Sequence, residues 1–167
     1  MQALRHRARV IFLGAPGSGK GTYARELSKF LGVSAISTGD MIREHVERKS
    51  SLGMEFEGYI KGGLLAPDEL VTNMLLSKLE SERLDGFILD GFPRTIRQAE
   101  LLAEAGSIMD ISAVIDISLK EEFIVKKLLG RRVCSRCKTS YNVASVYENG
   151  GEYDMPAMPA PEACEAY

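Results

Sequence analysis

The residues best suited to chemistry in this sequence form one glycine-rich segment, whose members are Gly14, Ala15, Pro16, Gly17, Ser18, Gly19, Lys20, Gly21 and Thr22. The segment lies between the apolar run Val10 to Leu13, which predicts a strand, and Tyr23 to Leu31, whose apolar residues recur at helical spacing. Spaced glycines let successive backbone N–H groups point into one concavity, and the N-terminus of a following helix favours negative charge. The pattern therefore predicts a phosphate-binding loop, with Lys20 reaching the β- and γ-phosphates. The alternative is a glycine-rich turn that only joins a strand to a helix.

Two further motifs combine acidic residues with arginines. They are the segments 37–43, STGDMIR, and 89–95, LDGFPRT. Asp90 comes at the carboxyl end of a predicted strand, which is the edge of a parallel sheet where ligands gather. Arginine suits phosphate because its guanidinium binds oxygen atoms in pairs and stays charged. Taken singly, each motif also fits a plainer interpretation, a turn-forming Asp90 before Gly91 or a solvated surface arginine.

Taken together, GAPGSGKGT, STGDMIR and LDGFPRT closely resemble the three sequence signatures of the adenylate kinases, in that family's order and at similar spacings. The general P-loop pattern has Ser or Thr directly after the lysine, whereas here Gly21 follows Lys20 and Thr22 supplies the hydroxyl. This departure narrows the choice among P-loop families. The resemblance weakens only after about Asn149. It implies an α/β fold with a P-loop NTPase-type parallel sheet flanked by helices, and with NMP-binding and lid insertions. It also implies reversible phosphoryl transfer from MgATP to AMP, which gives two ADP.

The resemblance assigns roles to residues that match the family's motifs. The catalytic cations that it implies are Lys20, Arg43, Arg94 and Arg131. In the family the arginines at the positions of Arg43 and Arg94 hold the AMP phosphate. Arg131 lies where the family has an arginine at the base of the lid, which contacts the transferring phosphates. The donor nucleotide is implied to contact Lys127 besides residues 14–22, and Asp90 is implied to help hold Mg²⁺ through water. The implied AMP pocket consists of Thr38, Arg43, Leu65, the Ala66 backbone, Gly91, Arg94 and Gln98.

Two positions favour adenine as the acceptor base. Thr38 stands where adenylate kinases usually have threonine and pyrimidine monophosphate kinases usually have alanine. Gln98 matches the family's adenine-contacting glutamine, and an amide can donate and accept at once, as the adenine edge requires. Without the family, Thr38 is only a helix cap and Gln98 only a solvent-facing helix residue. A UMP/CMP-type kinase and a non-catalytic nucleotide-binding fragment remain the alternatives.

Two features of the second half depart from the family pattern. Lys127 stands where the family commonly has an arginine that stacks on the ATP adenine; lysine lacks the planar guanidinium, so the donor preference stays open. Cys134 and Cys137 resemble the start of a zinc-bearing long lid, but a structural zinc needs four ligands. Cys164 follows after a longer interval than that subfamily has, and Tyr167 is a poor zinc ligand. The alternative is a lid that descends from a zinc form or is cut through its second ligand pair.

The remaining sequence must supply the elements that carry these motifs. The apolar spacing predicts strands at Phe87 to Leu89 and Ala113 to Ile117, and helices from Pro67 through Leu79, from about Thr95 to Ala105, and around Phe123 to Leu129. Repeated β-α units imply a parallel sheet covered by helices on both faces. The predicted parts are a core at 1–37 and 67–130, an AMP-binding insertion at 38–66 and a partial lid at 131–167. Short helical patterns occur in the insertion at Met41 to Lys49 and Met54 to Lys61.

Composition and charge limit the partners of this chain. Its 167 residues are 45% hydrophobic and 26% charged, which suits one domain with insertions. The net charge of -2 gives no electrostatic case for nucleic acid or membrane as a partner. No apolar run approaches the roughly 20 residues of a bilayer span, so we expect a cytoplasmic protein, monomeric as in the family, whose partners are ATP, AMP and ADP. The family's later arginines, edge strand and closing helix do not follow, which predicts a C-terminally truncated member with impaired activity.

Overall fold

The computed structural model describes residues 7–106, 110–136, 140–148, 150 and 153–158. The chain forms two compact units. The first unit comprises residues 1–13 and 20–116, and the second comprises residues 14–19 and 117–167. Within the described residues, no helix combines the length and the apolar character that crossing a membrane requires.

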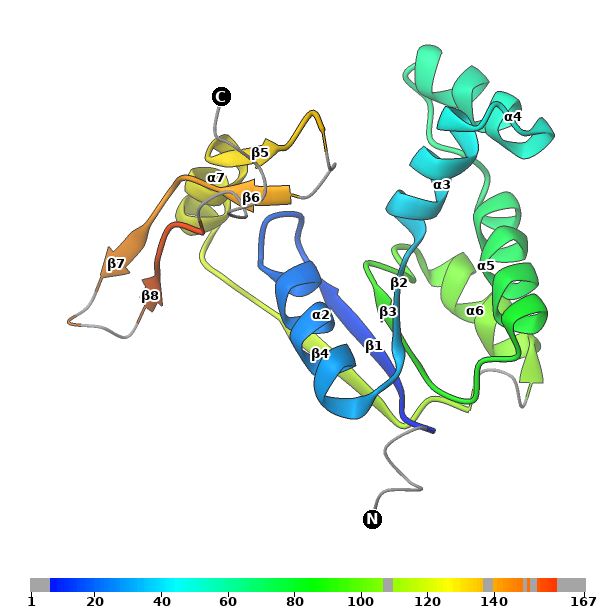
Figure 1. Cartoon of the computed structure of the whole chain (residues 1–167), viewed down its shortest axis with the longest axis horizontal. Coiled ribbons are helices and arrows are strands. Elements are labelled where there is room, and N and C mark those ends of the chain that lie inside the picture. Colours follow the sequence, from blue (N-terminus) through cyan, green and yellow to red (C-terminus); the bar gives the residue numbers. More distant parts are fainter. Residues whose placement is uncertain (1–6, 107–109, 137–139, 149, 151–152, 159–167) are drawn as a thin grey trace. The chain divides into compact units, whose positions relative to one another are not determined.

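A four-stranded sheet with strand order β2-β3-β1-β4 forms the centre of the first unit (Figure 1). Its strands are β1 (Arg9–Gly14), β2 (Ser34–Ser37), β3 (Phe87–Asp90) and β4 (Ala113–Ile117). Strands β1 and β2 both run parallel to β3, in a register that sets Phe12 and Ser37 opposite Asp90. The chain therefore leaves all three strands at the same edge of the sheet.

Three strands agree with the sequence prediction, whereas β2 was not predicted. β1, β3 and β4 coincide with the apolar runs that the sequence shows. In β2, by contrast, Ile36 is the only large apolar residue, and it is 3% exposed. One apolar residue gives no alternation, so this strand depends on its pairing with β3.

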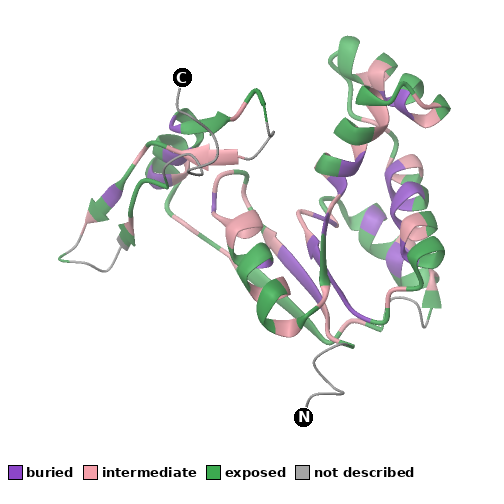
Figure 2. Ribbon diagram, in the orientation of Figure 1, coloured by how far each residue is buried: buried purple, intermediate pink, exposed green. Residues whose placement is uncertain are grey.

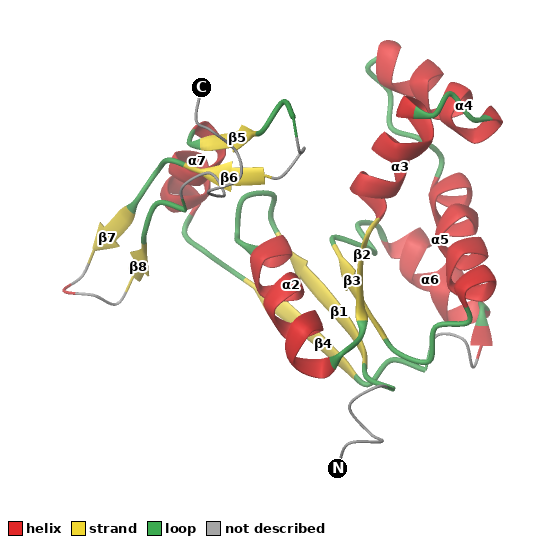
Figure 3. Cartoon of the chain, in the orientation of Figure 1, coloured by secondary structure: helices red, strands yellow, loops and turns green. Residues whose placement is uncertain are grey.

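The helices of the first unit are α2 (Lys20–Leu31), α3 (Thr38–Glu47), α4 (Ser51–Lys61), α5 (Asp68–Glu82) and α6 (Ile96–Glu104) (Figure 3). They confirm the predicted helices, but α3 and α4 begin about three residues early. The reason is capping: Ser37 Oγ accepts from the Asp40 N–H at 3.3 Å, and Ser50 Oγ accepts from the Gly53 N–H at 3.0 Å. The interpretation of Thr38 as a cap is therefore wrong, because Thr38 is the buried first residue of α3.

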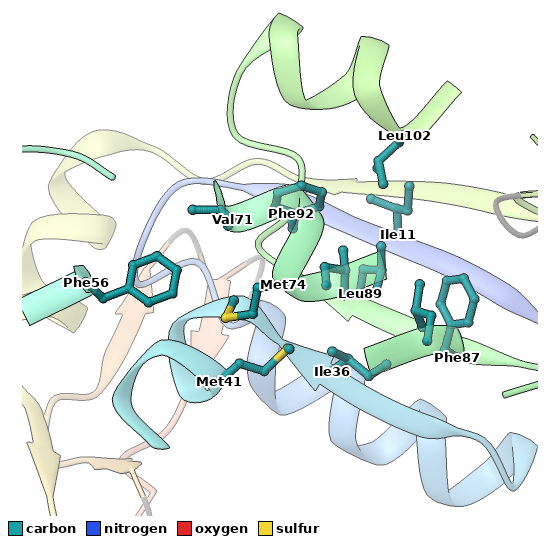
Figure 4. Packing of buried hydrophobic residues seen from close by; sticks show 12 residues of the cluster. Ile11, Ile36, Met41, Phe56, Val71, Met74, Phe87, Leu89, Phe92 and Leu102 are labelled. Atoms are coloured by element: carbon teal, nitrogen blue, oxygen red, sulfur yellow. The ribbon is translucent and has the colours of Figure 1, made fainter. Parts of the chain in front are cut away.

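The central strands are buried on both faces because their residues alternate between two layers of helices. Ile11 and Leu89 belong to the core cluster that also contains Leu75 of α5 (Figure 4). Val10 and Ile88 alternate with these residues along β1 and β3, lie outside that cluster and are also buried, and helix α2 contacts β3. Leu75, Ile88 and Leu89 are 0% exposed, and each such side chain contributes about 1.5–3 kcal/mol through burial.

Strand β4 at the sheet edge is less covered than the central strands. Val114 and Ile115 remain 57% and 37% exposed. Figure 2 shows the same contrast, with buried residues on the central strands and on α5, and exposed residues along β4. The predicted parallel sheet flanked by helices is therefore confirmed, and among the described residues its central strands β1 and β3 are more completely buried than the edge strand β4.

Among its described residues, the second unit contains one helix and two antiparallel strand pairs. These elements are α7 (Glu121–Leu129), β5 (Arg131–Val133) with β6 (Ser140–Asn142), and β7 (Val146–Glu148) with β8 (Tyr153–Met155). The helix was predicted, whereas no strands were predicted in segment 131–167, which the sequence analysis assigned to a partial lid. Asn142 and Met158 exchange two backbone hydrogen bonds of 3.0 and 2.7 Å, which join the end of β6 to the segment after β8.

Gly53 provides a test of the packing between α3 and α4. A Cβ added at Gly53 would lie 2.0 Å from the carbonyl oxygen of His45, so any side chain there separates the two helices. We expect Gly53→Ala to lower the free energy of unfolding by about 1–3 kcal/mol in urea titrations. Gly58→Ala is the matched control in α4, because a Cβ there meets nothing within 4 Å. Helix propensity should make the control more stable by about 0.5–1 kcal/mol; equal midpoints for both variants would contradict this packing.

Candidate functional site

The phosphate loop predicted from the sequence requires glycine for two separate reasons. Gly14 has φ +132°, a conformation that other residues rarely adopt, and a Cβ there would lie 2.3 Å from the carbonyl oxygen of Ile117. Gly17 also has positive φ, and a Cβ there would lie 3.0 Å from Cγ of Leu128. The loop backbone thus follows a tight path that side chains at these positions would block.

Ser18 within this loop carries a buried polar atom that suits an external ligand. The side chain is 3% exposed, and its Oγ has no hydrogen-bond partner among the described residues. A buried hydroxyl without a partner costs about 1–3 kcal/mol. A phosphate oxygen in the loop would accept from this hydroxyl, so the residues present fit a phosphate group.

Asp90 lies at the carboxyl end of β3 and depends on the glycine that follows Lys20. A Cβ on Gly21 would lie 2.8 Å from Oδ2 of Asp90, so the carboxylate occupies the space that a side chain would need. The departure from the general P-loop pattern at Gly21 therefore has a steric reason. Burial raises the pKa of Asp90, and the nearby Lys20 ammonium acts against that rise.

Arg94 joins this group through the turn that follows β3. Its Nε donates to the carbonyl oxygen of Gly91 at 2.8 Å. A Cβ at Gly91 would lie 3.4 Å from Arg94 Nη2 and 3.9 Å from Lys20 Cε, so both cations flank the turn. One carboxylate and two cations therefore gather at the end of a single buried strand. Such a group can hold phosphate oxygens and a hydrated divalent cation.

Gln98 belongs to the same turn region and is not the solvent-facing residue that local sequence alone allows. It is 5% exposed, and both ends of its amide are bonded. Oε1 accepts from the Arg94 backbone N–H at 2.8 Å, and Nε2 donates to Asp68 Oδ1 at 2.7 Å. Sequence reasoning missed Asp68, which looked like an ordinary acid in the first turn of a helix after Pro67.

The other residues of the predicted AMP pocket have different environments. Thr38 is buried, whereas Arg43 is exposed and forms an ion pair with Asp40 one turn earlier. Such exposed pairs contribute only about 0–1 kcal/mol, so Arg43 can exchange this partner for a phosphate. Leu65 is 93% exposed and Ala66 is half-buried against the core cluster. The described contacts join Gly91, Arg94 and Gln98 with one another, and none of them joins this group to Leu65.

Lys127 in the second unit has a role that the sequence did not indicate. It is 8% exposed, and its Nζ donates to the carbonyl oxygens of Ala144 at 2.9 Å, Met155 at 2.9 Å and Pro156 at 3.2 Å. Burial lowers the pKa of Lys127, whereas three carbonyl acceptors favour its charged form. The ammonium therefore ties α7 to the segments around both strand pairs, and it does not lie at an exposed position where a base could stack.

Arg131 and Cys134, both in the segment predicted to be a lid, lie in β5 or directly after it. Arg131 is exposed, and its Nε donates to Ser140 Oγ at 3.0 Å across the β5–β6 strand pair. Cys134 lies half-buried directly after β5, whereas Cys137 and Cys164 lie outside the described residues. In the described part of the chain, no group of three or more His, Cys, Asp or Glu side chains could hold a metal ion. The zinc prediction therefore stays a prediction.

Comparison with known proteins finds relatives that align with most of this chain. Residues 12–158 match a family model described as adenylate kinase. An adenylate kinase from Solanum tuberosum is 46% identical over 151 residues, which cover 89% of this chain and 51% of the relative. A probable adenylate kinase 6, chloroplastic, from Oryza sativa subsp. japonica is 45% identical over 168 aligned residues, covering 96% of this chain and 58% of the relative. An adenylate kinase from Moorella thermoacetica is 43% identical over 163 residues, 95% of this chain and 70% of the relative. The chain spans about half the length of the two plant relatives.

Replacing Lys127 tests whether its ammonium holds the second unit together. Lys127→Met would remove the hydrogen bonds from a charged donor to the carbonyl oxygens of Ala144, Met155 and Pro156, and each hydrogen bond to a charged group contributes about 1.5–3 kcal/mol. We expect amide hydrogen exchange in residues 140–148 to become at least about tenfold faster.

Lys126→Met is the matched control for this variant. Lys126 lies next to Lys127 on α7 and forms an exposed ion pair with Glu148 at 2.9 Å, worth at most about 1 kcal/mol. Amide hydrogen exchange in residues 140–148 of the Lys126→Met variant should stay close to that of the wild type. Equal exchange rates in the two variants would show that the buried contacts of Lys127 are not needed.

Proposed function

Because this chain belongs to the adenylate kinase family, we propose that it transfers a phosphoryl group reversibly from MgATP to AMP, giving two ADP. The observation that carries the proposal is the group at the end of β3, where Asp90, Lys20 and Arg94 surround the turn at Gly91. Transfer between two nucleotides brings two polyanions together, so such a site needs fixed cations and little covalent chemistry from the protein.

The two cations in this group suit different parts of that task. Lys20 begins α2 directly after the phosphate loop, where a point charge reaches the donor phosphates. Arg94 binds the Gly91 carbonyl through Nε, and within the described residues its two Nη groups carry no other hydrogen bond. A guanidinium held at one nitrogen presents the other two as a fork that matches phosphate oxygens. We therefore assign the donor phosphates to Lys20 and the AMP phosphate to Arg94, with Arg43 assisting.

Magnesium fits the carboxylate of this group. Mg²⁺ usually keeps several waters and binds through one or two carboxylates plus substrate phosphates, so a single half-buried Asp90 is sufficient. Bound with the donor nucleotide, the ion neutralises charge on the phosphates. The Asp90 carboxylate, which fits closely against Gly21, would hold the water shell of the ion.

Further assignments concern the acceptor nucleotide, the lid, the location and zinc. AMP is proposed as acceptor because Gln98 offers a buried amide next to Arg94. Arg131 is proposed as a lid-base contact of the donor phosphates because it is exposed at the start of β5. A monomeric state and a cytoplasmic location stay predictions, and the relative from Oryza sativa carries the word chloroplastic in its name. Zinc binding rests on Cys134 with Cys137, of which only the former is described.

Substitution of the two cations tests the proposal. Lys20→Met and Arg94→Ala should each lower kcat/KM for ADP formation by about a hundredfold or more, the usual effect of losing one charge contact in a transition state. Arg97→Ala is the matched control, because Arg97 is a nearby arginine that forms surface ion pairs with Glu69, Glu100 and Glu104. It should retain wild-type activity.

Two results would contradict the proposal. The first is an Arg94→Ala variant that keeps more than about a tenth of the wild-type activity with an unchanged far-UV spectrum. The second is a wild-type chain that binds ATP yet forms no ADP from ATP and AMP with Mg²⁺, which would favour a non-catalytic nucleotide-binding protein. Turnover with UMP or CMP in place of AMP would instead favour a pyrimidine monophosphate kinase.

A further inference from the structure

We propose that Asp68, which lies outside all three sequence motifs, is a positioning residue that makes the acceptor site selective for adenine by fixing the orientation of the Gln98 amide. The inference rests on the proposed function, since it assumes that Gln98 faces the base of the acceptor nucleotide. It adds a residue from the start of α5, 30 positions before Gln98 in the chain.

The Asp68 carboxylate uses both oxygens to hold the first turn of α6. Oδ1 accepts from Gln98 Nε2 at 2.7 Å, and Oδ2 accepts from Thr95 Oγ1 at 2.8 Å. Thr95 Oγ1 in turn accepts from the Gln98 backbone N–H at 3.1 Å and caps α6. The side chain and the backbone of Gln98 are therefore both fixed by one carboxylate, directly or through one hydroxyl.

The partners of the Gln98 amide are of opposite kinds, and this determines which end points where. A carboxylate only accepts hydrogen bonds, and a backbone N–H only donates them. The Gln98 amide therefore directs its NH₂ group to Asp68 and its oxygen to the Arg94 N–H. A flipped amide would set oxygen against oxygen at Asp68 and N–H against N–H at Arg94, and each buried mismatch costs about 1–3 kcal/mol.

A fixed amide distinguishes two bases of the same size. Gln98 keeps one further N–H on Nε2 and one further lone pair on Oε1, because each atom uses only part of its capacity in the bonds above. The N1/N6 edge of adenine presents an acceptor beside a donor, which matches that pair. Hypoxanthine has the same shape but a carbonyl at C6 and an N–H at N1, so it needs the flipped amide. A site whose polar groups cannot reorganise rejects such an analogue strongly.

A purely structural role for Asp68 predicts a different outcome. Asp68 is also an acid in the first turn of α5, where a negative charge stabilises any helix. Its neighbour Glu69 shares this position and also bridges α5 to α6, through Arg97 at 3.1 Å, yet it has no contact with Gln98 among the described hydrogen bonds. Glu69→Ala is therefore the matched control for loss of helix charge and of an α5–α6 link.

The test measures binding of AMP and of inosine monophosphate by titration calorimetry, on the full chain, with melting temperatures recorded in parallel. We expect Asp68→Ala to reduce the preference for AMP over inosine monophosphate by about tenfold or more, corresponding to one lost buried hydrogen bond. Asp68→Asn should have a smaller effect, since the Arg94 N–H still opposes a flip and an asparagine oxygen can still accept from Gln98. Glu69→Ala should leave the preference unchanged.

The outcomes distinguish a failure of the inference about Asp68 from a failure of the proposed function. If Asp68→Ala and Asp68→Asn both keep the wild-type preference within about twofold, the inference is overturned while the proposed function stands. If Asp68→Ala does not fold, Asp68→Asn decides alone, and a preference equal to that of Glu69→Ala overturns the inference. A wild-type chain that binds ATP but neither monophosphate would overturn the proposed function and the inference together.

Discussion

The parallel register of β1, β2 and β3 is the constraint on which the candidate site depends. Phe12 and Ser37 both lie opposite Asp90, so the chain leaves the three strands at one edge of the sheet. The glycine-rich loop, the start of α3 and the turn at Gly91 begin there. A one-residue slip would turn every side chain of a strand to its other face. Buried residues such as Leu89 and Ile36 prevent this, and so they determine where the polar chemistry lies.

Several glycines are needed because neighbouring groups occupy the space that a side chain would take. At Gly21 the space of a Cβ is occupied by the Asp90 carboxylate, and at Gly14 by the carbonyl oxygen of Ile117. At Gly53 the same close approach packs α4 against α3, which carries Thr38 and Arg43. Where backbone and carboxylate approach this closely, only glycine avoids a clash. Gly21 and Gly53 therefore help to set the geometry of the first unit, and Gly14 helps to set that of the second.

Two side chains that were predicted to bind nucleotide also form hydrogen bonds within the protein. Gln98 and Lys127 were both predicted to contact bases, and both are almost fully buried with hydrogen bonds to the protein itself. For Gln98 the protein partners leave one donor and one acceptor position, which is the capacity that the proposed contact with a base requires. For Lys127 the three carbonyl acceptors match the three donors of an ammonium, so its bonding capacity is used within the second unit. The same degree of burial thus supports a binding role in one case and a structural role in the other.

The sequence alone determined the glycine-rich loop, the helices of the described residues, three of the four sheet strands and the acids and arginines of the three motifs. These features depend on local signals, namely glycine spacing, apolar periodicity and residue type at the end of a strand. The tertiary structure decided the rest. β2 depends on pairing with β3, Asp68 meets Gln98 across 30 positions, and Lys127 meets carbonyl groups 17 to 29 positions away. A hydrogen bond between distant segments leaves no periodic trace in either one, because each partner looks locally like an ordinary surface residue until the fold brings the two together.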